Sequence, residues 1–201
     1  MPRSTRAVPA LRRALDRPAI VQQGVFNMAP RRRRGRGAGE MRAKGRAGGE
    51  AVFRSSSPGE TRAIGARLGA LLGPGSVLAL HGELGSGKTC FVQGLADGLG
   101  IARSAGVSSP TFVIINEYPA RIPLFHFDLY RLPGGRELVE LGWGDYLDRG
   151  GVIAIEWAER MGDLLPDGHL AVTLEVTGER TRLITISGKG ADTLAEEMAG
   201  P

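Results

Sequence analysis

The sequence predicts an α/β fold, with a mainly parallel sheet flanked by helices and with added antiparallel hairpins. Continuous apolar runs at residues 77–80 and 152–155 are typical of strands buried on both faces. Segments with apolar residues at helical spacing alternate with these runs, which favours parallel strands joined by helices. Two further pairs of β-rich segments are each joined by a short turn, as in hairpins.

The elements follow in order from Ala51, where a short strand begins. A helix comes next, with Ser57 as its N-cap and Pro58 at its first position, and the Gly-Pro-Gly at residues 73–75 ends it. A second helix follows the glycine-rich segment 82–89. The remaining expected elements are a hairpin of residues 112–118 with 123–129, a short helix at 136–141, the strand at 152–155, and a terminal hairpin of residues 169–176 with 181–187.

Charge divides the chain into a tail and one domain. Residues 1–49 carry 13 Lys and Arg side chains against two acidic ones, a net charge of +11, whereas the other 152 residues carry a net charge of −6. Large apolar residues are sparse in the basic segment, so we expect a disordered tail or a wrongly assigned start, with Met28 and Met41 as later start points. A nucleic-acid-binding arm and a transit peptide are the alternatives. We expect one domain over residues 50–190 and a C-terminal tail over residues 191–201.

The composition also bears on the compartment. No apolar run approaches the roughly 20 residues that a membrane-spanning helix needs, so we expect no membrane segment. Cys90 is the single cysteine and cannot form an internal disulfide, which fits a reducing compartment, and we expect a cytoplasmic protein. Cys90 itself is expected to be a small buried helix residue rather than a reactive thiol.

A phosphate-binding loop, or P-loop, is indicated by Gly82-Glu83-Leu84-Gly85-Ser86-Gly87-Lys88-Thr89, which has the pattern G-x-x-x-x-G-K-T. The glycines let the backbone fold tightly around an anion, and the N–H groups then form a concave nest at a helix N-terminus. Lys88 is placed to reach the β- and γ-phosphates, and the Thr89 hydroxyl is placed to bind Mg²⁺. The sequence therefore predicts ATP and Mg²⁺ as ligands of this loop.

Two carboxylates are candidates for the neighbourhood of the metal. Asp128 and Glu156 each end a hydrophobic run, and an open sheet presents its ligands outside the carboxyl ends of its strands. The segment 108–111, Ser-Ser-Pro-Thr, is a candidate switch loop whose hydroxyls would sense a γ-phosphate, or else a simple turn cluster. His126 is interpreted as a strand residue beside Asp128, and Trp157 as a core or edge aromatic.

Several segments together carry a more distinctive pattern than the P-loop. They are residues 81–89, Ser108-Ser109-Pro110-Thr111-Phe112, His126-Phe127-Asp128-Leu129-Tyr130-Arg131-Leu132, residues 137–142 and Ile155-Glu156-Trp157. In their order and spacing the chain resembles the TsaE family, small bacterial P-loop ATPases of tRNA threonylcarbamoyladenosine biosynthesis. The resemblance covers roughly residues 51–187. Cys90 departs from the family pattern, which often has a second threonine there.

The resemblance implies a P-loop NTPase fold and ATP hydrolysis with Mg²⁺. The family acts with the proteins TsaD and TsaB, which place a threonylcarbamoyl group on the adenosine beside the anticodon, so tRNA is met only through the complex. Catalytic roles are implied for Lys88, Asp128 and Glu156, with Thr89 and Glu156 as Mg²⁺ ligands. The nucleotide site implied by the resemblance also includes the P-loop residues Glu83, Leu84, Gly85, Ser86 and Gly87, the switch-loop residues Ser109 and Thr111, Thr61 at the nucleotide border, and Arg180 near the adenine.

Two other functions stay open beside a partner-driven ATPase. A small-molecule kinase would use the same loop to phosphorylate an acceptor, but the chain after Thr89 offers no arginine-dense lid. An RNA-binding module would depend on the basic segment, but the acidic remainder of the chain disfavours contact with a phosphate backbone.

Overall fold

The computed structural model describes residues 49–199, so the predictions for the basic segment 1–49 lie outside the described residues, except at Gly49. The strands are β1 (Glu50–Ser55), β2 (Val77–His81), β3 (Ile115–Tyr118), β4 (Leu124–Asp128), β5 (Val152–Glu156), β6 (Leu170–Val176) and β7 (Arg182–Ser187). The helices are α2 (Pro58–Leu71), α3 (Lys88–Gly98), α4 (Gly135–Glu140), α5 (Trp143–Asp148) and α6 (Ala191–Ala199), with short 3₁₀ turns at Arg103–Ala105, Ala158–Arg160 and Gly162–Leu164. No helix within residues 49–199 is long and apolar enough to cross a membrane.

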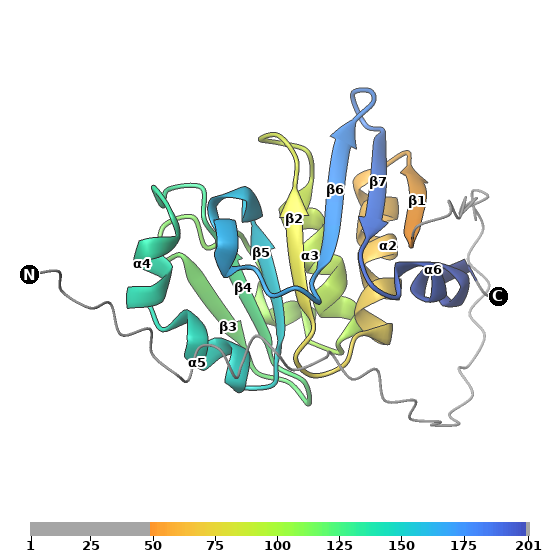
Figure 1. The fold of residues 1–201 in the computed structure, drawn as a ribbon. Helices are drawn as coiled ribbons and strands as arrows, with labels where there is room; N and C mark the ends of the chain where they lie inside the picture. The colour runs from red at the N-terminus through yellow and green to blue at the C-terminus, as the bar shows by residue number, and fades with distance from the viewer. Residues whose placement is uncertain (1–48, 200–201) are drawn as a thin grey trace, which may run out of the picture.

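One sheet of seven strands, in the order β1-β7-β6-β2-β5-β4-β3, forms the centre of the molecule (Figure 1). Its middle is parallel, because β2 pairs with both β5 and β6, and β5 pairs with β4. The edges are antiparallel, through β3 with β4 and through β1 and β6 with β7. The predicted fold class is therefore confirmed. The two expected hairpins form as well, and β6 of the terminal hairpin is a full member of the main sheet.

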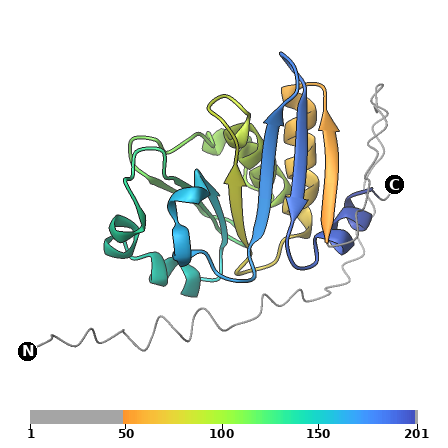
Figure 2. The same ribbon diagram turned by 45° about the horizontal axis from the view of Figure 1, so that its top comes forward.

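The central strands are buried on both faces, as their unbroken apolar runs predicted. Successive side chains of a strand point to opposite faces, and Leu78 and Leu80 join one core cluster while Val77 and Ala79 join another. The first cluster packs against α2, α3 and α6, and the second against α4 and α5. Figure 2 shows α2 lying along the face of β7 and β1. Helices on both faces leave the carboxyl edge of the parallel strands open for a site.

The first expected hairpin begins three residues later than predicted. The N–H groups of Val113 and Ile114 donate to the carbonyl of Pro110 at 3.0 and 2.6 Å, which closes a turn. Ile114 takes a left-handed φ of 70° there, so its backbone cannot continue an extended strand. Phe112 is 83% exposed as a result and does not enter the core.

The expected C-terminal tail was a wrong interpretation for residues 191–199, which form α6. Ala191, Ala195 and Met198 are buried in the first core cluster, at the i, i+4, i+7 spacing of one helical face. Arg67 of α2 also donates to the carbonyl of Met198 at 2.6 Å. Two of the three buried side chains are alanines, and the helix docks against α2, β1 and β7, which stabilises so short a helix.

A surface ion pair joins β3 to the end of α5 and gives a pH-dependent prediction. Arg149 donates to both carboxylate oxygens of Glu117, and the Tyr146 hydroxyl donates to one of them at 2.7 Å. The Arg149 bond foremost, and then the Tyr146 bond, lower the pKa of Glu117 from 4.5 to about 2. A lowered pKa in the folded state means that the carboxylate stabilises the fold above pH 4.5 and that this contribution is lost as the pH falls towards 2.

We therefore expect Glu117→Gln to lower the free energy of unfolding slightly at neutral pH, since the carboxylate is 43% exposed and the pair is screened by water. The difference from wild type should shrink as the pH is lowered below 4.5. Urea denaturation at a series of pH values measures it, and a difference that does not change with pH would contradict the assignment.

Candidate active site

The P-loop joins the carboxyl end of β2 to the first residue of α3. Gly85 and Gly87 have φ values of 79° and 104°, a left-handed backbone that favours glycine. Gly87 is the N-cap of α3, so the helix begins at Lys88 and its N-terminus faces the loop. Gly82 needs the absence of a side chain, because a Cβ there would lie 2.5 Å from the Leu174 carbonyl oxygen. The loop thus has the tight backbone that the glycine spacing predicted.

A cavity of about 420 Å³ opens beside this loop at the carboxyl edge of the sheet. It is lined by residues of the P-loop, of the switch-loop segment 108–111 and of the ends of β4 and β5. Nine of the predicted site residues line it: Leu84, Gly85, Gly87, Lys88, Thr89, Ser109, Thr111, Asp128 and Glu156. Tyr130 and Trp157 complete the lining.

Lys88 is held inside the P-loop by its own backbone. The side chain is buried, and its Nζ donates to the carbonyls of Gly82 at 2.6 Å and Glu83 at 3.0 Å. Nζ also lies 4.0 Å from the centre of the Trp157 ring, a cation–π contact. Burial lowers the pKa of Lys88, and the nearby carboxylate of Glu156 opposes that shift. The loop therefore holds an ammonium group at the place where an anion would be bound.

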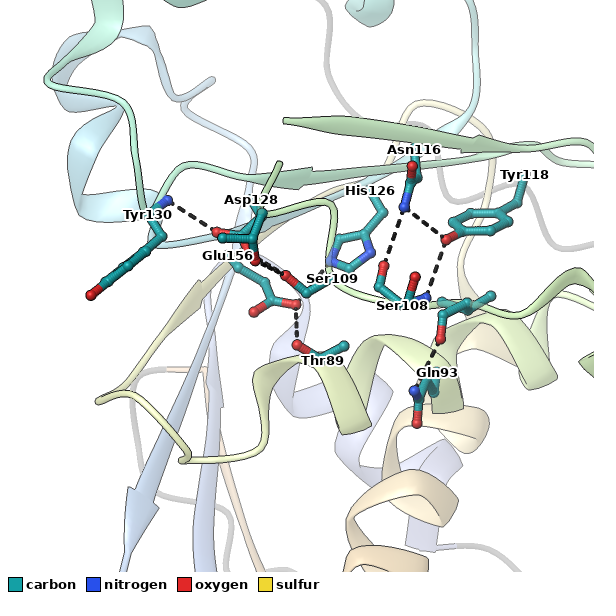
Figure 3. A network of polar contacts seen from close by, with 12 residues as sticks. Thr89, Gln93, Ser108, Ser109, Asn116, Tyr118, His126, Asp128, Tyr130 and Glu156 are labelled. Atoms are coloured by element: carbon teal, nitrogen blue, oxygen red, sulfur yellow. Dashed lines mark hydrogen bonds and ion pairs between the residues drawn. The ribbon is translucent and has the colours of Figure 1, made fainter. Parts of the chain in front are cut away.

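The ends of β4 and β5 place a carboxylate against the P-loop threonine. Thr89 Oγ1 donates to Glu156 Oε1 at 2.8 Å, and His126 Nε2 lies 2.9 Å from the same oxygen (Figure 3). Glu156 is 4% exposed and His126 is fully buried. A hydroxyl and a carboxylate oxygen are ligands of the kind that Mg²⁺ prefers, so the pair fits the metal predicted for it.

His126 has a role that the sequence interpretation did not give it. His126 and Asp128 are two residues apart in β4, so their side chains point to the same face of the sheet. The two-residue repeat of the strand and the parallel pairing of β4 with β5 bring the imidazole of His126 to Glu156. The hydrogen bond between them fixes the orientation of the carboxylate.

Asp128 holds the switch-loop segment 108–111 over the cavity. Its Oδ2 accepts bonds from the hydroxyls of Ser109 and of Thr111, the latter at 2.8 Å, and its Oδ1 accepts from the backbone N–H of Tyr130 at 3.0 Å (Figure 3). The two hydroxyl oxygens lie 2.6 Å apart. The Ser-x-Thr spacing and the strand-end carboxylate thus form one cluster at the mouth of the site.

The other end of the switch-loop segment is tied to α3 and β3. Gln93 of α3 donates to the Val107 carbonyl at 3.0 Å. The hydroxyl of Tyr118 accepts from the Ser108 N–H at 3.3 Å, and Asn116 donates to the Ser108 carbonyl at 3.3 Å (Figure 3). Residues 107–111 are thus held by separate hydrogen bonds to Asp128 at the cavity, to α3 and to β3.

Comparison with known proteins assigns the chain to one family. The family model described as "Threonylcarbamoyl adenosine biosynthesis protein TsaE" matches residues 55–184. The chain belongs to the TsaE family. The resemblance seen in the sequence is thereby confirmed.

Relatives from distant bacteria agree with this assignment. The chain is 41% identical to the tRNA threonylcarbamoyladenosine biosynthesis protein TsaE of Bacillus subtilis over 150 residues, 73% of this chain and 92% of the relative. It is 40% identical to the protein of the same name from Treponema pallidum over 133 residues, 66% of this chain and 97% of the relative. The crystal structure of Bacillus subtilis YdiB matches with a TM-score of 0.61 and 34% identity, covering 79% of this chain and 96% of that one. The fold is that of a P-loop NTPase.

Four of the expected TsaE site residues do not line the cavity. Glu83 and Ser86 lie within the P-loop, where the Ser86 N–H donates to the Glu83 carbonyl at 3.1 Å. Thr61 is buried behind the loop, 2.7 Å from the Ser55 hydroxyl and against Gly87. Arg180 is exposed in the turn between β6 and β7. The nucleotide contacts proposed for these residues stay predictions.

Three further side chains lie in or near this TsaE-family site: those of Trp157, Tyr130 and Cys90. Trp157 packs against the second core cluster, as expected of a core or edge aromatic, and it also lines the cavity, with its ring centre 5.1 Å from that of Tyr130. Its position in the sequence, directly after the strand-end Glu156, could have indicated that Trp157 lies at the cavity. Cys90 is half-buried with Sγ 3.2 Å from the Pro58 carbonyl, and burial raises the pKa of its thiol, which fits a structural role.

Proposed function

We propose that this chain hydrolyses ATP with Mg²⁺ and supports TsaD and TsaB in forming threonylcarbamoyladenosine beside the anticodon of tRNA. The observation that carries the proposal is a single cavity shared by a P-loop, the Thr89–Glu156 pair and the Asp128 cluster, in a chain of the TsaE family. The cytoplasm, where tRNA is modified in bacteria, is the proposed compartment. No feature of the site favours the small-molecule kinase.

Each residue has a chemical role in this proposal. The loop N–H groups and Lys88 bind the phosphates and stabilise the charge that develops on them. Thr89 and Glu156 supply oxygen ligands to the metal, and Mg²⁺, when bound, neutralises phosphate charge and orients the phosphates for attack. Asp128 accepts hydrogen bonds at the mouth of the cavity, so it is placed to orient a water there once the switch-loop hydroxyls turn to the nucleotide.

Two parts of the proposed site would come from outside this chain. Within residues 49–199 no group of three His, Cys, Asp or Glu side chains gathers to hold a metal, so the metal would depend on phosphate oxygens and water for its other ligands. No arginine is among the residues that line the described cavity, and arginines that complete P-loop sites in trans raise turnover by about 10³ to 10⁵. Slow hydrolysis by the isolated chain is therefore expected.

The test is ATP hydrolysis by the purified chain with and without a TsaD–TsaB pair. We expect turnover to rise at least about tenfold with the pair, since a partner would complete the site. A TsaD–TsaB pair alone, measured in parallel, gives the background. Full turnover that is indifferent to the pair would contradict the partner-driven mechanism and direct the search to kinase acceptors.

A further inference from the structure

Arg182, the first residue of β7, ties the P-loop to the terminal hairpin. Its Nε donates to the Ser86 carbonyl at 2.8 Å, and its Nη2 donates to the Gly85 carbonyl at 3.2 Å. Nη1 donates to the carbonyls of Gly178 at 3.1 Å and Thr181 at 2.9 Å. One guanidinium thus holds carbonyls of the P-loop and of the turn between β6 and β7, although Arg182 is 96 residues from Ser86 in the chain. Arg182 is not among the residues that line the cavity.

The hydrogen bonds from Arg182 to the loop carbonyls also set the direction of neighbouring N–H groups, because each peptide unit is planar. The peptide bonds of the described residues are all trans. In a trans peptide the carbonyl of one residue and the N–H of the next point in opposite directions. Holding the Ser86 carbonyl towards Arg182 therefore turns the Gly87 N–H to the opposite side. The Gly85–Ser86 unit is held from both ends, because Arg182 binds the Gly85 carbonyl and the Ser86 N–H donates to the Glu83 carbonyl at 3.1 Å.

The pinned peptide units lie where the loop is most free to rotate. Gly85 and Gly87 flank Ser86, and glycine visits left-handed and right-handed conformations with little penalty. No backbone carbonyl of the described residues accepts from the N–H of Gly87 outside the regular helices and strands. Arg182 is thus the side chain that fixes the Ser86–Gly87 unit through the Ser86 carbonyl. N–H groups that point together form the nest on which an anion is bound.

We propose that Arg182 is a positioning residue for the nucleotide phosphates: it holds the Gly85 and Ser86 carbonyls outward, so that the Gly87 N–H of the P-loop stays turned towards the anion. The guanidinium also places a positive charge behind the loop, which strengthens its attraction for phosphate. The inference rests on the proposed function for the identity of the ligand, and on the hydrogen bonds alone for the order of the loop.

The first measurement is the affinity for ADP by isothermal titration calorimetry. Arg182→Met keeps the length of the side chain and loses every donor, so we expect ADP to bind about tenfold more weakly or worse. Arg182→Lys keeps the charge but reaches fewer carbonyls, so its ADP affinity should lie between those of wild type and Arg182→Met. Arg54→Met is the matched control, because Arg54 is exposed on the neighbouring β1. It should bind ADP as wild type does.

The second measurement is hydrogen–deuterium exchange of the P-loop peptide without nucleotide. We expect faster exchange at residues 82–88 in Arg182→Met than in wild type or Arg54→Met, with the peptides of β2 and β5 unchanged. A role confined to general stability would raise exchange across the sheet as well. If Arg182→Met does not fold, Arg182→Lys carries both measurements.

The outcomes distinguish failure of the positioning role of Arg182 from failure of the proposed function. Equal ADP affinity and equal loop exchange in wild type and Arg182→Met would overturn the positioning role while leaving the proposed function intact. A wild-type chain that does not bind ADP would overturn the proposed function, and the exchange measurement would still decide whether Arg182 orders the loop.

Discussion

Glu156→Gln is expected to lower Mg²⁺-dependent ATP hydrolysis about 100-fold or more, because it removes the charge of the proposed metal ligand at the transferring phosphate. Glutamine fills the same volume, and its amide can still meet the Thr89 hydroxyl that now lies 2.8 Å from Glu156. The variant should therefore fold. ADP affinity measured in EDTA should stay close to wild type, whereas the gain in affinity on adding Mg²⁺ should be lost.

Glu159→Gln is the control for this prediction. Glu159 lies three residues further along, with a side chain that is 52% exposed and 3.5 Å from His81. Glu159→Gln removes one negative charge from the same region without changing a contact of Thr89, so hydrolysis should stay near the wild-type rate. Equal losses in both variants would mean that the local negative charge, and not a metal ligand, is what the site needs.

Gly94→Ala is expected to destabilise the fold by about 3 kcal/mol, since the added methyl has no space between two helices. A Cβ at Gly94 of α3 would lie 2.1 Å from the carbonyl oxygen of Arg62 and 3.0 Å from the N of Ala66, both in α2. These are backbone atoms, so the helices themselves must move apart. Alanine ordinarily favours a helix over glycine by about 1 kcal/mol, and the packing reverses that sign. Urea denaturation measures the change.

Gly59→Ala makes the same substitution in the first turn of α2. The nearest atom to a Cβ there is the Ser57 hydroxyl oxygen at 3.8 Å, an ordinary contact. Stability should be unchanged or should rise by up to about 1 kcal/mol, because alanine restricts the unfolded chain. If Gly94→Ala and Gly59→Ala behave alike, the close approach of α2 and α3 is not what the glycine serves.

Much of the fold was predictable because local interactions decide it. Ser57 caps α2 through a bond from the Glu60 N–H at 3.2 Å, which the Ser-Pro order indicated. The apolar runs of β2 and β5 predicted burial on both faces, and the glycine pattern predicted the P-loop. The two wrong boundaries also had local causes: Ile114 turns into the left-handed region, and two of the three buried residues of α6 are alanines, which give a weak apolar pattern.

The sequence by itself determined the chemistry at each position: a loop able to wrap a phosphate, a lysine and a threonine at its end, and carboxylates where two strands stop. Only the tertiary structure decided which of these meet. Thr89 reaches Glu156 across 67 residues because β2 and β5 are neighbours, and Arg182 reaches the P-loop because β6 pairs with β2. Periodicity reports the environment of a residue along its own element, whereas the partner of a side chain depends on strand order. That order is set by the free energy of packing the whole sheet against its helices.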